Sequence, residues 1–528
     1  MKQKIISFLH KPCITFSWLS AFLYGLFFIL MLVTIANKEN YHIDEMATFK
    51  LANYSGKSHF ATEKQTYIPA EQPYIDMLTV PEKHRFKYST VWKNQKRDVH
   101  PPFYYALIHT ICSVFYKDFS EAPAAAVNII FALLTLWAFR QVVRGLTNKD
   151  PYICALLSLA FILSTGILSN ISFYRMYVVA MFWVTLLSAL FIKELDAPKI
   201  DKYFLIKFYL IVVLGSLTHY YCIVFATFIC AVFGLYLLCQ KRWGCLGRFI
   251  GVGIVALGSI YAIFPATFKH LFFSYRGQES FSNLAQSLSE YWEKLKIFYS
   301  IINKDVFGGF FGYLVLGLFV LIILSFILQK GRLLFSKNEM KKYALILIPI
   351  FLYFFVIAKI AVYNTDRYMF PIYAIIIGSV FSLASMIVLK VIKNKISYVI
   401  LAAALLTLVV HAYQIASWTY LYKKSVPFLS ETKKYGDTDC LYVATDRWKM
   451  DHPFKEIKNY RSFTFISEDH LDDLKQLVIA KQKKLIVLII DDNQMVLKKI
   501  MSKYPQLTHY QKLGSFGYTT TYYLYGNK

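Results

Sequence analysis

Apolar runs of about 20 residues recur along this chain and limit its fold more than any other feature. A helix of about 20 apolar residues spans the roughly 30 Å hydrocarbon core of a bilayer. Charged residues make up only 17% of the 528 residues, and hydrophobic residues make up 57%. The runs lie near residues 13–36, 120–140, 152–171, 173–195, 202–218, 220–240, 248–270, 305–329, 342–362, 366–390 and 395–418. The sequence therefore predicts a polytopic α-helical membrane protein with about 11 to 13 transmembrane helices.

Two of the apolar segments need separate treatment. The first run is too long for a secretory signal and has no small-residue cleavage site after it, so we expect a retained helix. Residues 103–117 are apolar for only about 15 residues, which is marginal for a span. We expect a re-entrant or half-buried helix there, entered through Pro101 and Pro102.

The formal charge of +26 is unevenly distributed. Lys and Arg gather in short loops between alternate apolar runs, which is the positive-inside pattern of a membrane protein rather than a nucleic-acid surface. With a cytoplasmic N-terminus, one face of the membrane receives Lys2, Lys4, Lys11, Arg140, Arg144, Lys149, Lys193, Lys199, Lys202, Lys241, Arg242, Arg248, Lys330, Arg332, Lys337, Lys341, Lys342, Lys390, Lys393 and Lys395. The sequence thus predicts no nucleic-acid partner.

The opposite, extracytoplasmic face then receives the long loop 37–102, the tail from about 419, and a few ionisable side chains at helix ends. Ionisable residues at membrane boundaries are costly and often functional. Each one alone could equally be an interfacial side chain that reaches toward the headgroups. The set comprises Asp44, Glu45, His100, Arg175, His219, Asp366 and Arg367.

Loop 37–102 is expected to carry one or two short amphipathic helices at the interface. One of these, over residues 44–54, would place Met46, Phe49 and Leu51 in lipid. Such a helix would hold Asp44 and Glu45 near the headgroups.

The tail differs in composition and predicts a small soluble α/β domain. Residues 440–446 and 484–492 are β-branched runs, 467–482 has helical periodicity with Ser467 as N-cap, and 515–526 alternates like a strand. The predicted domains are therefore a transmembrane domain, 1–420, which includes loop 37–102, and an extracytoplasmic domain, 421–528. Asp491 and Asp492 end a predicted strand, which favours a solvated strand end over a metal site.

A carboxylate and arginines at a membrane surface suit transfer of a sugar from a lipid phosphate. The phosphate is already a competent leaving group, so one base that accepts the proton of an acceptor hydroxyl suffices. Guanidinium groups would offset the charge that develops on the departing phosphate.

Five motifs then carry a resemblance to a known family. They are Asp44–Glu45 after the first helix, "HPP" at 100–102, "FYRMY" at 173–177, "THYY" at 218–221 and "DRYMFPIY" at 366–373. In this order, at the same ends of membrane helices, they resemble the C-type glycosyltransferase superfamily. The bacterial branch similar to protein O-mannosyltransferases and lipid A aminoarabinose transferases is nearest. The resemblance covers about residues 1–420.

The resemblance implies a role for each matching position. Asp44 would be the catalytic base, with Glu45 as a helper or metal ligand. Tyr174, Arg175, Arg367 and Tyr368 would lie at the donor phosphate, and His100, Pro101, Tyr177, His219 and Tyr220 would line the cleft. His219 could equally be a satisfied histidine at a helix end. No cofactor is certain, although some relatives bind a divalent cation, for which Glu45, His100 and His219 are the candidates.

The implied activity is an inverting transfer from a polyprenyl-phosphate sugar to a hydroxyl of an envelope glycolipid, glycan or protein. The implied location is the bacterial inner membrane, with the site facing the periplasm or exterior. One alternative is an O-antigen or capsule polymerase, but those enzymes usually depend on a large late loop. The other is a transporter or lipid-linked sugar flippase, which usually has mid-bilayer charges and repeated halves.

Overall fold

The structure is a computed structural model that describes residues 12–56, 61–116, 118–195, 197, 200–328, 334–420, 425–451 and 453–527. The chain divides into two compact units, which are described separately. Unit 1 comprises Met1–Asn37, Gln95–Tyr104 and Ala125–Thr419, and unit 2 comprises Lys38–Asn94, Tyr105–Ala124 and Tyr420–Lys528. Whether these units correspond to functional domains stays a prediction.

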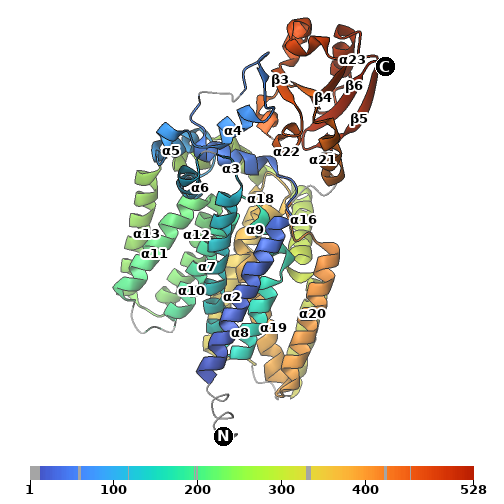
Figure 1. Ribbon diagram of the computed structural model, residues 1–528. Helices are drawn as coiled ribbons and strands as arrows, with labels where there is room; N and C mark the ends of the chain where they lie inside the picture. The colour runs from blue at the N-terminus through green and yellow to red at the C-terminus, as the bar shows by residue number, and fades with distance from the viewer. Residues whose placement is uncertain are drawn as a thin grey trace, which may run out of the picture. The chain divides into compact units, whose positions relative to one another are not determined.

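Unit 1 is a bundle of long helices that run side by side (Figure 1). Its helices are α2 (Pro12–Ala36), α7 (Ala122–Leu146), α8 (Pro151–Ile162), α9 (Thr165–Ser172), α10 (Tyr177–Leu195), α11 (Lys202–Thr218), α12 (Tyr220–Cys239), α13 (Trp243–Ile263), α14 (Ala266–Phe272), α15 (Tyr275–Ser282), α16 (Leu288–Phe307), α17 (Phe311–Leu328), α18 (Lys337–Ile360), α19 (Phe370–Ile392) and α20 (Ile396–Ile415).

Among the described residues, eight helices are long and apolar enough to cross a membrane. The number rises to ten if each of two bent pairs, α8 with α9 and α16 with α17, is one span. Helices α10 and α19 are the most buried of these spans and form the centre of the bundle, whereas α13 and α20 expose most of their apolar side chains, as helices in contact with lipid do. The structure confirms the predicted class, a polytopic helical membrane protein.

The segment before α17 differs from the prediction. The predicted apolar runs 248–270 and 305–329 leave residues 271–304 between them as a loop, but α15 and most of the 20-residue α16 occupy this stretch. Ser287 and Glu290 form a reciprocal capping box at the start of α16, and its mixed charge hid the helix from a search for apolar runs. Helix α6 (Phe103–Val114) has 12 residues and is too short to cross a bilayer, in agreement with the prediction for that segment.

Unit 2 is built around a six-stranded sheet in the order β1-β3-β2-β4-β6-β5. The strands are β1 (Thr66–Tyr67), β2 (Asp439–Val443), β3 (Ser462–Ile466), β4 (Lys484–Ile490), β5 (His509–Phe516) and β6 (Thr519–Tyr525). Strands β3, β2 and β4 are parallel, and β1, β6 and β5 are antiparallel to their neighbours. The edge strand β1 comes from the first long loop, so that loop and the tail share one sheet.

Helices complete unit 2. From the first loop come α3 (Ile43–Asn53), α4 (Gln72–Leu78) and α5 (Tyr88–Arg97), and from the tail come α21 (Val426–Thr432), α22 (Phe454–Ile457) and α23 (Gln494–Lys503). Val496, Leu497 and Ile500 of α23 join the core formed with the sheet residues Val443 and Val487.

Two local predictions in unit 2 were wrong, and a third was correct only in part. Met46 and Phe49 of α3 are buried in protein rather than in lipid, and Phe49 packs edge-on against Phe119 at 5.0 Å between ring centroids. Residues 468–481 form 3-10 helices, and the Ser467 side chain caps none of them. The strand expected over 515–526 is part of the β5–β6 hairpin, because Gly517, at φ +60°, turns the chain there.

Candidate functional site

A histidine with partners on both sides occupies the segment between α5 and α6 in unit 1. The Nδ1 atom of His100 lies 2.6 Å from Oδ2 of Asp98. The other ring nitrogen, Nε2, lies 3.4 Å from an Nη atom of Arg175. Burial opposes ionisation of Asp98, but His100 and Arg175 outweigh it and hold the pKa of this carboxyl below its usual value. The three side chains therefore form a continuous polar chain from carboxylate to guanidinium.

Arg175 lies in the tight turn between α9 and α10, where its side chain is only 3% exposed. Its backbone N–H donates to the carbonyl of Phe173 at 2.7 Å. The amide of Asn128, on α7, donates to the carbonyls of Ile171 and Phe173, both at 2.9 Å. Asn128 thus satisfies two carbonyls at the end of α9 and fixes the turn that carries Arg175.

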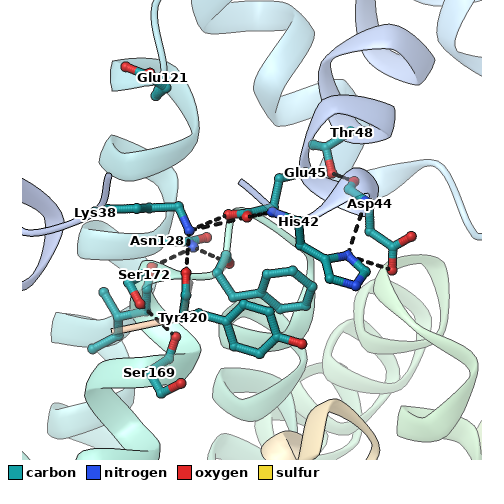
Figure 2. A network of polar contacts seen from close by, with 12 residues as sticks. Lys38, His42, Asp44, Glu45, Thr48, Glu121, Asn128, Ser169, Ser172 and Tyr420 are labelled. Carbon is teal, nitrogen blue, oxygen red and sulfur yellow. Dashed lines mark hydrogen bonds and ion pairs between the residues drawn. The ribbon is translucent and has the colours of Figure 1, made fainter. Parts of the chain in front are cut away.

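The same turn is reinforced from two further directions. The hydroxyl of Ser172 donates to the carbonyl of Ser169 at 2.9 Å, as Figure 2 shows. The hydroxyl of Tyr104, on α6, donates to Oδ1 of Asn128 at 3.3 Å. The "HPP" segment and the "FYRMY" turn, 75 residues apart in sequence, are therefore connected by buried hydrogen bonds as well as by the His100–Arg175 contact.

His219 joins α11 to α12 and lies beside the same cluster. Its Nδ1 accepts the N–H of Tyr221 at 3.0 Å, so it caps α12 as a helix-end histidine does. Its ring centroid is 5.2 Å from that of Tyr177 and 6.4 Å from that of His100. Burial lowers the pKa of His219 well below its usual value, and the nearby guanidinium groups of Arg175 and Arg367 lower it further. The Nδ1 atom that accepts the Tyr221 N–H carries a lone pair, as it does in a neutral imidazole.

Arg367 lies on a single 3-10 turn, Asp366–Tyr368, between α18 and α19. Its guanidinium lies 5.5 Å from the ring centroid of Tyr363 and 5.7 Å from that of Tyr368, both cation–π distances. The Tyr368 ring packs edge-on against Tyr221 at 5.4 Å between centroids. Burial raises the pKa of Asp366 to about 6, although hydrogen bonding to Arg367 N–H opposes the rise.

The remaining predicted residues of unit 1 differ in their burial. Tyr174 and Pro101 are buried. Tyr220 differs from the others, because its hydroxyl pairs with Nδ1 of His270 at 2.8 Å, on α14. The structure thus brings His100, Arg175 and His219 together, with Arg367 close enough to affect His219 electrostatically, and it directs Tyr220 toward α14.

Unit 2 holds the acidic pair at the start of α3. His42 is the N-cap, and its Nδ1 accepts the N–H of Asp44 at 3.1 Å. The Glu45 carboxylate accepts the N–H of His42 at 2.7 Å and so completes a capping box. The Asp44 side chain is 29% exposed, whereas that of Glu45 is 0% exposed. The two carboxylates therefore have different environments although they are adjacent in sequence.

The ammonium of Lys38 compensates the charge of the buried Glu45 carboxylate (Figure 2). Its Nζ lies 3.0 Å from Oε1 and 3.1 Å from Oε2 of Glu45. The same ammonium donates to the carbonyl of Tyr420 at 2.6 Å, so it ties the first loop to the start of the tail within unit 2. Burial lowers the pKa of Lys38, and the negative charge of Glu45 opposes that shift.

The described residues offer no group of three or more His, Cys, Asp or Glu side chains positioned to hold a metal ion. His100 and His219 are neighbours, but His100 is bound by Asp98, and Glu45 is bound by Lys38 and the His42 backbone. A divalent cation bound by these side chains stays a prediction. Unit 1 supplies the buried guanidinium of Arg175, the half-buried guanidinium of Arg367 and the His219 imidazole, and unit 2 supplies the partly exposed Asp44 carboxylate.

Three residues of these two clusters, Asp98 and Asn128 in unit 1 and Lys38 in unit 2, were missed in the sequence. Asp98 precedes the "HPP" motif by two residues, and this position is the one sequence feature that could have identified it as part of the cluster. Lys38 and Asn128 carry no sequence signal, since a lysine after a membrane helix and an asparagine within one occur in many membrane proteins without a role in a site.

No known protein-family profile and no curated protein matches the chain by sequence. Solved structures do match it by fold. ArnT from Cupriavidus metallidurans, solved with bound undecaprenyl phosphate, superposes with a TM-score of 0.52 at 10% identity, over 96% of this chain and 97% of that chain. The Archaeoglobus fulgidus oligosaccharyltransferase, solved with Zn and sulfate, gives a TM-score of 0.44 at 12% identity, over 89% of this chain and 67% of that chain.

The extent of the ArnT match includes both the helical bundle and the tail. It agrees with the resemblance carried by the five sequence motifs. The chain has the fold of the polytopic C-type membrane glycosyltransferases.

Proposed function

We propose that this protein is an inverting glycosyltransferase that moves a sugar from a polyprenyl-phosphate donor to a hydroxyl of an envelope acceptor. The acceptor is a glycolipid, a glycan or a protein. The protein works in the bacterial inner membrane, and its site faces the periplasm or exterior. The observation that carries the proposal is the buried guanidinium of Arg175, a residue in the turn between the bundle helices α9 and α10. This guanidinium contacts His100, which in turn pairs with Asp98.

A buried guanidinium at a helix end is a binding group for phosphate. Arginine donates two parallel hydrogen bonds to phosphate oxygens, and low surrounding polarity strengthens them. Arg175 is assigned to the donor phosphate, with Arg367 as the second cation and Tyr174 and Tyr368 beside them. His100, Pro101, Tyr177, His219 and Tyr220 are assigned to the cleft. The fold likeness to ArnT, which was solved with undecaprenyl phosphate, supports a lipid phosphate as the donor.

The reaction then needs one base. The acceptor oxygen attacks the anomeric carbon from the face opposite the phosphate, so a new C–O bond forms as the bond from carbon to phosphate oxygen breaks. The leaving lipid phosphate keeps the bonding electrons, and the arginines offset its charge. Asp44 accepts the proton of the acceptor hydroxyl. The products are the glycosylated acceptor, with inverted anomeric configuration, and the free polyprenyl phosphate.

Asp44 is better suited to be the base than Glu45. Its carboxylate is partly exposed, whereas that of Glu45 is enclosed by Lys38 and the His42 N–H. Glu45 is therefore assigned to the support of the α3 N-terminus.

The test is the glycoconjugate profile of a deletion strain that carries wild-type, Asp44→Asn or Asp76→Asn protein. Asp76 is an exposed aspartate of the same unit, so Asp76→Asn is the matched loss of one charge. We expect the wild-type and Asp76→Asn proteins to restore the missing glycoconjugate and Asp44→Asn to lower its amount by about 100-fold or more. A transporter or flippase would restore the profile with Asp44→Asn, and that outcome would refute the proposal.

Donor binding is measured separately with purified protein. Undecaprenyl phosphate should bind wild-type and Asp44→Asn protein equally and bind Arg175→Ala at least about tenfold more weakly. Equal binding by Arg175→Ala would remove this residue from the phosphate site.

A further inference from the structure

Asp98 provides a carboxylate in contact with His100 that the proposed reaction does not use. Its Oδ2 is 2.6 Å from Nδ1 of His100, the distance of a strong, charge-assisted hydrogen bond. Neither side chain is more than 25% exposed, so water competes little for either partner. The opposite ring nitrogen meets the Arg175 guanidinium at 3.4 Å.

The hydrogen-bond donors and acceptors on either side of His100 determine which ring nitrogen carries the proton. A guanidinium only donates hydrogen bonds, and a carboxylate only accepts them. Nε2 must therefore offer its lone pair to Arg175, and the ring proton must reside on Nδ1, where Asp98 accepts it. The alternative tautomer would set an N–H of His100 against an N–H of Arg175 and a lone pair of His100 against the carboxylate.

We propose that Asp98 is a positioning residue that selects the Nδ1–H tautomer of His100, so that Nε2 accepts a hydrogen bond from Arg175 and orients its guanidinium. Carboxylates perform this service for histidines that bind metal ions. Here the oriented group is instead the Arg175 guanidinium, a cation that binds anions. The inference rests on the proposed function only in naming the lipid phosphate as the ligand of Arg175; the tautomer itself follows from the contacts.

Substitutions at positions 98 and 100 distinguish an effect of Asp98 that passes through His100 from a direct effect of Asp98 or a general loss of structure. Asn at position 98 has both a donor and an acceptor, so it accepts either tautomer. Gln at position 100 has a carbonyl oxygen that accepts from Arg175 whatever residue is at 98. Asp98→Asn should therefore be harmful when residue 100 is His and nearly silent when it is Gln.

The experiment is a double-mutant cycle on the full chain in lipid nanodiscs, with undecaprenyl phosphate as the probe. Asp98→Asn should weaken binding about tenfold in the wild-type background. In the His100→Gln background the same change should weaken binding by less than about twofold. An equal loss in both backgrounds means that Asp98 acts without His100, and that result overturns the proposal. The apparent melting temperature of each variant identifies loss of folding, and Asp98→Glu, which keeps the carboxylate, should retain more affinity than Asp98→Asn.

A second readout needs no ligand and so remains valid if undecaprenyl phosphate fails to bind the wild-type protein. Histidine is labelled with ¹⁵N, and the His100 signals are identified by their absence in His100→Gln. At a pH where the ring is neutral, the wild-type proton should be on Nδ1, and Asp98→Asn should give a substantial population with the proton on Nε2. A wild-type proton on Nε2, or an unchanged tautomer in Asp98→Asn, would overturn the assignment even if the proposed function holds.

Discussion

The ammonium of Lys38 lies 3.0 Å from Oε1 of Glu45, and both side chains are almost completely buried. Removal of one partner from a buried ion pair is more harmful than removal of both, because it leaves the other charge in a nonpolar environment. Lys38→Met should therefore lower stability by about 3 kcal/mol. The double variant Lys38→Met with Glu45→Gln should recover most of that loss, since Gln still accepts the His42 N–H.

The apparent melting temperature in detergent, followed by tryptophan fluorescence, measures these differences. Lys50→Met, which removes a half-buried cation from helix α3, is the control. A double variant no more stable than Lys38→Met would show that the interaction between Lys38 and Glu45 does not account for the loss.

Asn128 should be essential to the geometry of the Arg175 turn. Asn128→Leu removes the donors to the Ile171 and Phe173 carbonyls. Loss of hydrogen bonds to two buried carbonyls costs about 2 kcal/mol. Affinity for undecaprenyl phosphate should fall as well, because the turn then holds Arg175 less firmly. Asn170→Leu, at a buried asparagine of α9, tests whether any buried amide has this effect; it should leave the affinity nearly unchanged.

The tail should lose stability as pH rises. Glu456 is fully buried, and it accepts hydrogen bonds from Tyr460 at 2.8 Å and Thr521 at 2.6 Å. Burial raises its pKa to about 7, although the hydrogen bonds from Thr521 and Tyr460 lower it in part. Because the folded pKa exceeds the unfolded value, the stabilising effect of the protonated form is complete below about pH 4.5 and lost as pH rises through about 7.

The free energy of unfolding of the tail should fall by about 3 kcal/mol between pH 4.5 and pH 8. Thermal unfolding across that range should show a decline for wild type that Glu456→Gln largely removes, because Gln keeps an acceptor for Tyr460 and never ionises. A parallel decline in both proteins would assign the pH dependence to other groups.

Sidedness is tested with single cysteines in a cysteine-free chain. Arg144, exposed near the end of α7, lies in the loop region predicted to be cytoplasmic, and Lys498, exposed on α23, lies in the tail predicted to be outside. An impermeant maleimide added to intact cells should label Lys498→Cys and spare Arg144→Cys. The reverse pattern would invert the predicted topology.

The helices of unit 1 were predictable because lipid imposes a long apolar run on each span. Every predicted run contains a helix, and run 152–171 is broken into α8 and α9 by a 50° bend. Helix α16 was missed because Lys294, Lys296 and Lys304 interrupt its apolar pattern. In unit 2 the strands β2 and β4 were predictable from β-branched residues, but β1, with two residues, has no pattern of its own.

The site was only partly predictable, for a different reason. Polar residues at helix ends are visible in a sequence, so His100, Arg175, His219 and Arg367 were found. The different environments of Asp44 and Glu45 were not visible in the sequence, because they depend on the ammonium of Lys38, seven residues before Glu45. Asp98 was missed because a carboxylate two residues from a histidine is common, and only the 2.6 Å contact distinguishes it.

Strand β1 has a consequence for how this protein is made. Thr66 and Thr464 share a hydroxyl hydrogen bond of 2.9 Å across β1 and β3, although they are 398 positions apart in the chain. A ribosome that adds about 5 to 20 residues per second delivers the second threonine roughly 20 to 80 s after the first. Throughout that interval the early segment has no sheet to join, and it is then most open to proteases and to chaperones. Maturation of this unit therefore waits until strands β2 to β6 have been translated, long after helix α2.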